Sequence, residues 1–305
     1  MTSAVDATAL EHLMQALAEV LNETGQFLAS KGHKPVEDSI AAWELVKFPG
    51  PELVATAYGQ ADILIQVAAE QVTCFIRACT EPALTIAPLS AVRAVLESCA
   101  LASWLLDPLI DAESRVKRSL AFRYDGLDQQ VKMARVARYP GGLEASSRRI
   151  ESVEQSALKV GIGPVVDKKG KRIGIGEVMP PITILTDQTL GEEATYRLLS
   201  AVTHAHPWAL QKLSFNILRI EGTPPTDSSS GRASPEAFLH KAAKPLCFQY
   251  LAHVSMKAFT KPVLYKAKLF GWEPGLLEAR IEVHRQRITE LAEAIAFDAE
   301  AEEGG

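Results

Sequence analysis

The sequence predicts an all-α protein built around a central helical bundle. Apolar residues recur at helical spacing along most of its 305 residues, for example at Leu10, Leu13, Leu17, Val20 and Leu21. Proline- and glycine-containing connections separate several of these segments. Strand-like patterning is confined to one short stretch near residues 161–177. We therefore expect helices packed on helices, with one small hairpin inserted.

The composition is that of an ordinary globular protein. It is 47% hydrophobic and 23% charged, with a net charge of −5. This balance argues against a whole surface built to follow a phosphate backbone, but it leaves room for a local basic patch. No uncharged run reaches the roughly 18 residues that span a bilayer. Asp6 and Glu11 stand where a signal peptide would be basic and then apolar, so we expect a soluble cytoplasmic protein without membrane contact.

The first third of the chain predicts three long helices. Residues 1–50 form an N-terminal helix over Asp6–Lys31 and a connection with one helical turn around Ile40–Val46. A second long helix covers Glu52–Cys79, and the third runs from about Ile86 to Leu106. The third helix is apolar on every side except for Arg93 and Glu97, which lie four residues apart on one face. A central helix of this kind needs partners for its charges.

The fourth predicted helix is basic. It begins at the N-cap Asp111, runs to about Tyr139 and includes Arg115 and Arg118 on a side that we expect to face water. Two interpretations are open for its charges: a solvated helix face, or a local wall that binds anions. A fifth helix follows over Leu143–Val160.

The stretch 161–177 predicts the hairpin. Two short β-like runs flank a Lys-Gly turn, and the tip is basic through Lys168, Lys169, Lys171 and Arg172. This tip is either a solvated turn or a contact for nucleic acid or another partner. Its Gly-x-Gly pairs lack the strand–loop–helix context of a phosphate-binding loop.

The helix predicted over Gly191–Trp208 carries the most suggestive cluster. At about 100° per residue, Glu193, Tyr196, Arg197, Ser200 and His204 share an arc of only about 100° on one face. A histidine that titrates near neutral pH, with an arginine on the same face, is suited to acid–base chemistry on a phosphate.

The remaining chain predicts a C-terminal helical extension. A helix over Trp208–Ile220 completes a central bundle of residues 51–220, and 221–234 is a Ser/Pro/Gly-rich linker. Helices over 235–297 start at Ser234-Pro235-Glu236, with a kink expected at Pro245 and a division at Pro262. An acidic, frayed tail forms 298–305.

Two of these segments together resemble a known group. The stretches RAVLESCALASWLLDP (93–108) and YRLLSAVTHAHP (196–207) are similar to uncharacterised bacterial helical proteins in which an Arg-x3-Glu helix precedes a Tyr-x3-Ser-x3-His helix. That group resembles the HEPN superfamily, whose ribonucleases carry an Arg-x4–6-His signature and cut RNA without a metal. The resemblance covers about residues 86–207 and implies a HEPN-like bundle, RNA as a partner and a homodimer. It also implies catalytic roles for Arg197 and His204.

In such a mechanism His204 would move the proton and Arg197 would hold the charged phosphoryl oxygens. Ser200 and Tyr196 would support them, with Arg93 and Glu97 behind. Leu198 follows Arg197 where active members usually have a polar residue, which favours the other interpretation. In that interpretation the same face is a polar network that locks two helices together or binds a ligand or partner, with Glu97 pairing to Arg197 or His204.

Other chemistries have little support in the sequence. The cysteines at 74, 79, 99 and 247 lack zinc-ligand spacing and lie in apolar helical contexts, as small hydrophobic residues do. His204 and His206 have no third ligand nearby in sequence, and no nucleophile elbow of the G-x-S-x-G type is present. We therefore expect neither a metal nor a cofactor.

Overall fold

The structure is a computed structural model that describes residues 4–80, 84–219, 237–241 and 245–303. Within these ranges it is all-α, as predicted, with two small hairpins as its only strands. The first six helices are α1 (Ala4–Ser30), α2 (Ile40–Lys47), α3 (Pro51–Cys79), α4 (Ala87–Leu105), α5 (Ala112–Val136) and α6 (Pro140–Leu158). After the hairpin of β1 (Pro164–Val166) and β2 (Arg172–Ile175) come α7 (Ile182–Leu190), α8 (Glu193–Thr203) and α9 (Pro207–Leu213). A second hairpin, β3 (Phe215–Arg219) with β4 (Ala237–Lys241), precedes α10 (Pro245–Phe270) and α11 (Gly275–Glu303).

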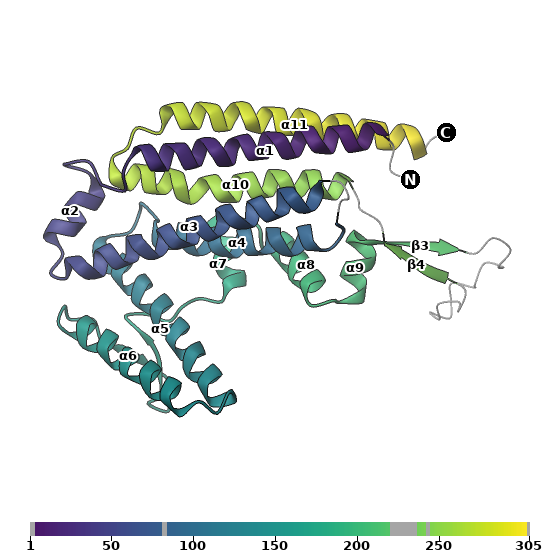
Figure 1. Ribbon diagram of the computed structural model, residues 1–305. Helices are drawn as coiled ribbons and strands as arrows, with labels where there is room; N and C mark the ends of the chain where they lie inside the picture. Colours follow the sequence, from purple (N-terminus) through teal and green to yellow (C-terminus); the bar gives the residue numbers. More distant parts are fainter. Residues whose placement is uncertain (1–3, 81–83, 220–236, 242–244, 304–305) are drawn as a thin grey trace.

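The long helices form two layers. Figure 1 shows α1 between α10 and α11 in one layer, with α3 and α4 running beneath them. The C-terminal helices pack on α1, α3 and α4, so the two ends of the chain share one layer. A single cluster of buried apolar side chains runs through both layers. Burial of these apolar stripes, rather than helix propensity alone, holds such helices in place.

A lobe projects from this body. Figure 1 shows α5 leaving the end of α4 and turning back as α6, with the β1–β2 hairpin against them. The root of the lobe is set by the predicted N-cap, because the Asp111 Oδ1 accepts a hydrogen bond of 2.8 Å from the Ser114 N–H. We call residues 112–177 the basic lobe.

Several expected boundaries in the C-terminal half were wrong. The helix expected over Trp208–Ile220 ends at Leu213 and continues as β3, and the helix expected from Ser234 is replaced at Ala237–Lys241 by β4. Pro245 begins α10 instead of kinking a helix, and α10 runs through Pro262 without a break. The linker predicted at 221–234 lies outside the described residues. The tail expected to fray at 298–305 continues α11 as far as Glu303.

No helix in the described ranges is both long enough and apolar enough to cross a membrane.

Candidate functional site

Three of the predicted site residues meet where α8 packs on α4. Tyr196 donates its hydroxyl to Glu97 Oε1 at 2.9 Å, and an Arg93 guanidinium nitrogen lies 2.7 Å from the same oxygen. The Arg93 guanidinium also lies over the Tyr196 ring, 5.7 Å from its centroid. We call these three residues the α4–α8 cluster. All three belong to the wider polar network that the sequence predicts for these two helices.

The hydrogen bond and the ion pair of the α4–α8 cluster hold the two helices together. Tyr196 is buried, and burial raises the pKa of its hydroxyl above the ordinary value, helped by the hydrogen bond to Glu97. Arg93 and Glu97 are half-buried and neutralise each other. The Arg93 Nε is buried and has no hydrogen-bond partner in the part of the chain that the structure describes. The expected pairing of Glu97 with Arg197 or His204 was wrong, since Glu97 binds Tyr196 and Arg93.

The predicted catalytic pair lies apart from this cluster. Arg197 is 65% exposed and donates its Nε to Glu193 Oε1 at 2.7 Å, one turn earlier on the same helix. α8 ends at Thr203, so His204 is the C-cap residue and its side chain is exposed. Ala205 then takes a left-handed conformation with φ 56°, which turns the chain towards α9. Ser200, which lies between Arg197 and His204 in the sequence, is half-buried. Arg197 and His204 are thus open to solvent and outside the interhelical cluster.

Two of the predicted nucleic-acid residues are structural instead. Arg115 is fully buried, where its Nε lies 2.9 Å from Glu44 Oε2 and its other nitrogens donate to the carbonyl oxygens of Leu105 and Asp107. Arg118 is half-buried and donates to the Trp104 carbonyl oxygen at 2.6 Å. The expectation that Arg115 faces water was wrong. Both arginines tie α5 to the end of α4.

The hairpin tip keeps its predicted character. Lys168, Lys169 and Lys171 are exposed around a turn in which Asp167 Oδ1 accepts hydrogen bonds from the backbone N–H groups of residues 169 and 171. Gly170 sits in this turn with φ 75°, a conformation that favours glycine. Arg172 differs, since its guanidinium pairs with Glu154 of α6 at 2.7 Å and its carbonyl oxygen accepts from the Tyr124 hydroxyl. Arg172 anchors the hairpin, and the lysines remain available at its tip.

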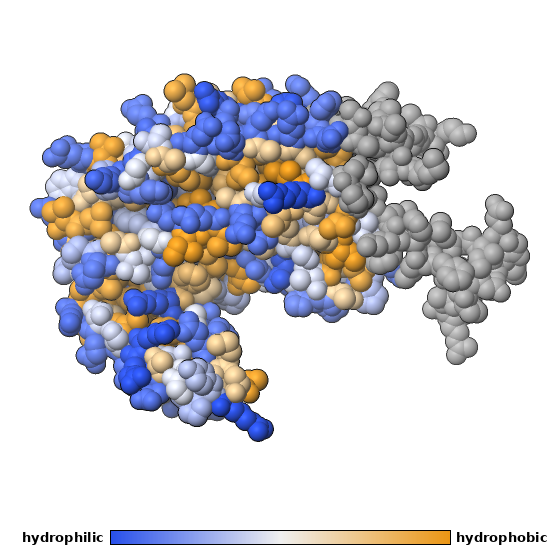
Figure 2. All heavy atoms as spheres, in the orientation of Figure 1, coloured by the Kyte–Doolittle hydropathy of each residue, from blue (hydrophilic) through white to orange (hydrophobic). Residues whose placement is uncertain are grey.

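Charge is strongly segregated between the basic lobe and the body. The lobe holds 14 Lys and Arg against 8 Asp and Glu, a net charge of +6, while the rest of the chain carries −11. On the face visible in Figure 2, hydrophilic side chains cover much of the projecting lobe. Exposed arginines on α5 and just beyond it add to the hairpin lysines; they are Arg123, Arg135 and Arg138. Tyr139, at the turn into α6, is 63% exposed. Sequence reasoning found the hairpin tip but not the contrast between lobe and body.

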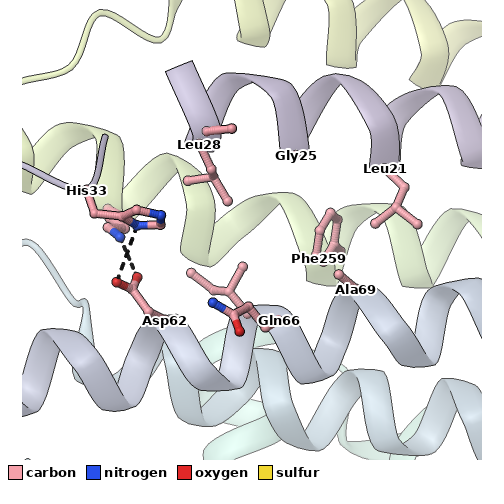
Figure 3. Close-up of a pocket in the computed structure, with 11 residues that line it drawn as sticks. Leu21, Gly25, Leu28, His33, Asp62, Gln66, Ala69 and Phe259 are labelled. Atoms are coloured by element: carbon pink, nitrogen blue, oxygen red, sulfur yellow. Dashed lines mark hydrogen bonds and ion pairs between the residues drawn. The ribbon is translucent and has the colours of Figure 1, made fainter. Parts of the chain in front are cut away.

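A pocket that the sequence did not indicate lies between α1, α3 and α10. Its volume is about 230 Å³, and its walls are largely apolar (Figure 3). The polar end contains Asp62, which accepts a hydrogen bond from the buried Lys266 and faces His33. Asp62 and Lys266 lie 204 residues apart, so no local pattern could pair them. A glycine within the apolar stripe of α1, Gly25, was the one signal available in the sequence.

Neither metal chemistry nor known relatives identify the site. In the ranges described above, no group of three or more His, Cys, Asp or Glu side chains is arranged to hold a metal ion. Comparison of the chain with protein-family models, with curated proteins and with solved structures gave no match.

Proposed function

We propose that this protein is a helical binding module that holds a polyanion, with RNA as the candidate, on its basic lobe. The observation that carries the proposal is the charge segregation: a projecting lobe of net charge +6 on a body of −11. Such a distribution attracts a polyanion to the lobe and repels it from the body, which orients the encounter. The HEPN-like resemblance of residues 86–207 points to the same class of partner.

The exposed side chains of the lobe suit a single-stranded polyanion. Lys168, Lys169 and Lys171 are free to contact phosphates, and their backbone is held by the Asp167 turn. Tyr139 offers an exposed ring on which a base can stack, as aromatic residues do in many single-strand binding proteins. A carbon added at Gly142 would lie 2.4 Å from that ring, so the glycine allows the ring to rest over the start of α6.

The test is RNA binding by charge-reversal variants. Labelled single-stranded RNA of about 20 nucleotides is titrated by fluorescence anisotropy at several salt concentrations, in excess EDTA. The lobe variant combines Lys168→Glu, Lys169→Glu and Lys171→Glu. The control makes the same charge change on exposed lysines of the body, through Lys34→Glu, Lys47→Glu and Lys268→Glu.

We expect the lobe variant to bind at least tenfold more weakly and the control variant to bind about as well as wild type. Each phosphate contact on a single strand contributes about −0.7 to the slope of log K against log salt. Losing three contacts therefore reduces the slope by about 2. Equal losses in both variants, or wild-type binding that ignores salt, would refute the proposal.

A second proposal, cleavage of RNA by Arg197 and His204, draws on the same resemblance. It is supported by the exposure of both side chains, which lets a substrate reach them. In Figure 1, however, α8 and α9 lie away from the basic lobe. Electrophoresis of the same RNA after incubation in EDTA tests this proposal together with the homodimer, whose mass is measured by analytical ultracentrifugation. Intact RNA at high enzyme excess would exclude cleavage and leave the binding proposal standing.

A further inference from the structure

The pocket between α1, α3 and α10 is separate from the basic lobe and from the α4–α8 cluster. We propose that it binds a small neutral molecule with an apolar body and one hydroxyl group. The apolar walls come from three helices, with Leu21 and Leu28 on α1, Ile65 on α3 and Phe259 on α10. The polar end comes from His33, Asp62 and Lys266. An apolar pocket with a few convergent polar groups is the usual form of a small-molecule site.

Gly25 opens the pocket. Leu21, Gly25 and Leu28 follow one another at positions i, i+4 and i+7 of α1, so they share one side of the helix, and all three line the pocket, with Gly25 exposed to solvent. In Figure 3 the two leucine side chains descend from α1 on either side of Gly25, and the space lies between them. A carbon added at Gly25 would meet no atom within 4 Å. Packing does not require a glycine at this position, and a glycine inside a helix is destabilising. What Gly25 provides is the empty space that a larger side chain would fill.

The charges at the polar end cancel. Lys266 is 1% exposed, donates to Asp62 Oδ1 and lies 5.0 and 5.3 Å from the ring centroids of Phe270 and Trp272. With this pair intact, Asp62 and Lys266 together contribute no net charge to the end of the pocket. The carboxylate of an acidic ligand would lie beside the carboxylate of Asp62, and the ammonium of a basic ligand would lie beside the ammonium of Lys266. A charged head group would therefore lose its hydration without gaining a free counter-ion, which disfavours charged ligands.

A ligand hydroxyl group fits the second carboxylate oxygen of Asp62, the one that does not accept from Lys266. The second oxygen of Asp62, Oδ2, faces His33 Nδ1 at 3.8 Å, which is beyond hydrogen-bond distance. A ligand hydroxyl near this oxygen donates its hydrogen to Oδ2. The same hydroxyl oxygen accepts from the Gln66 side-chain amide, which also lines the pocket, or from a protonated His33 nitrogen. A ligand without a hydroxyl leaves that carboxylate oxygen unused and loses the corresponding affinity.

The volume of the pocket sets the size of the ligand that it can hold. An engineered cavity of about 150 Å³ holds benzene, which has six heavy atoms. A pocket of about 230 Å³ is therefore suited to a ligand of roughly nine heavy atoms. A para-alkylated phenol such as 4-ethylphenol has this size, an apolar body and one hydroxyl. It serves as the probe.

The experiment compares three probes on the full chain by isothermal titration calorimetry: 4-ethylphenol, ethylbenzene, which lacks the hydroxyl, and phenylacetate, which is anionic. Two glycine variants locate the site. Gly25→Leu fills the pocket from α1. Gly59→Leu makes the same change inside α3 at an exposed glycine where an added carbon also meets no atom within 4 Å, and it lies outside the pocket. Both variants are expected to fold at least as stably as wild type, because leucine favours a helix more than glycine does.

We expect 4-ethylphenol to bind wild type and Gly59→Leu equally and to bind Gly25→Leu at least tenfold more weakly. Ethylbenzene is expected to bind wild type about tenfold more weakly than 4-ethylphenol, through the loss of about one hydrogen bond. Phenylacetate is also expected to bind about tenfold more weakly, because its carboxylate loses hydration without gaining a free counter-ion. Absence of binding up to millimolar 4-ethylphenol would overturn the proposal. So would unchanged binding by Gly25→Leu. Equal affinity for 4-ethylphenol and ethylbenzene would overturn the role of the polar end.

Discussion

Replacing Arg115 by methionine is predicted to destabilise the protein strongly, although the sequence predicts that its helix is basic and exposed to solvent. The Arg115 side chain is fully buried and makes two contacts with Glu44, at 2.9 and 3.3 Å. Glu44 is itself 7% exposed and also accepts a hydrogen bond of 2.5 Å from the Tyr58 hydroxyl. Removing the guanidinium leaves a buried carboxylate without its counter-ion and leaves two backbone carbonyl oxygens without their donor.

The magnitude follows from that loss. Removing one partner of a buried ion pair costs roughly 3–5 kcal/mol in free energy of unfolding. Unfolding entropy of about 2.1 cal/mol/K per residue gives roughly 0.6 kcal/mol/K for a chain of this length. The midpoint of thermal unfolding is therefore expected to fall by about 5–8 °C. Differential scanning calorimetry and urea unfolding followed by circular dichroism measure the two quantities.

A matched control lies on the same helix. Arg123 is exposed on α5, so Arg123→Met makes the same chemical change without breaking a buried pair and is expected to alter stability by less than about 0.5 kcal/mol. The double variant Arg115→Met with Glu44→Gln is expected to regain part of the loss, because it no longer buries an unpaired charge. Equal effects of Arg115→Met and Arg123→Met would refute the assignment of Arg115 as a buried anchor.

Three further predictions concern the α4–α8 cluster, the exposed pair and the thiols. Tyr196→Phe removes the hydrogen bond to Glu97 and is expected to cost about 0.5–1.5 kcal/mol in urea unfolding, whereas Tyr139→Phe, at an exposed ring, is expected to cost almost nothing. Arg197→Ala and His204→Ala are expected to leave the unfolding midpoint nearly unchanged, since both side chains are exposed; a large drop in either would show a packing role that the structure lacks. Burial raises the pKa of the Cys79 thiol to about 12, so at pH 8 only about one molecule in 10⁴ carries its thiolate. Ellman's reagent at pH 8 should therefore react rapidly with the exposed Cys74 and slowly with the buried Cys79 and Cys99, with Cys247 half-buried. A fast phase that survives in the double variant Cys74→Ser with Cys247→Ser would contradict the burial of Cys79 and Cys99.

Local signals in the sequence were sufficient for most helices and for the first hairpin. Asp111 caps α5 because its side chain and the N–H three residues later belong to the same turn, and such a signal is complete within four residues. The β1–β2 hairpin is similar, because the Lys-Gly turn joins strands that pair only a few residues apart. Where both partners of an interaction are near neighbours, the sequence pattern predicts the structure.

The second hairpin could not be predicted in this way. β3 pairs with β4 in register Phe215 to Lys241 and Arg219 to Ala237, across a stretch whose composition indicates only a linker. The proline after Ser234 is typical of a helix start, whereas the described residues Ala237–Lys241 pair with a distant strand. Pro262 shows the opposite effect: packing of α10 on several helices maintains the helix through a residue that normally breaks one.

The site was predicted in part for a similar reason. The arc containing Tyr196, Arg197, Ser200 and His204 assumes one continuous helix, and the assumption holds as far as Thr203. Tyr196 lies on the face that packs on α4 and donates to Glu97, a pairing expected for Arg197 or His204. His204 is the C-cap residue and keeps the hydrogen bond from its N–H to the Ser200 carbonyl oxygen, but its side chain is exposed and takes no part in the α4–α8 cluster. The pairings of Arg115 with Glu44 and of Lys266 with Asp62 join residues 71 and 204 positions apart, which no periodicity can indicate.

These pairings divide the cations of the basic lobe into two groups with different consequences. At the root, Arg115 and Arg118 bind Glu44, Asp107 and backbone carbonyl oxygens. These contacts fix the lobe to the body, and the two guanidinium groups are therefore not available to a partner. At the tip, the three hairpin lysines are exposed, so their charge is available to a partner. Substitutions at the root should therefore change stability first and binding only as a consequence, whereas substitutions at the tip should change binding at constant stability. A pattern counted from sequence treats both groups as one basic surface, and only the burial of each guanidinium or ammonium separates them.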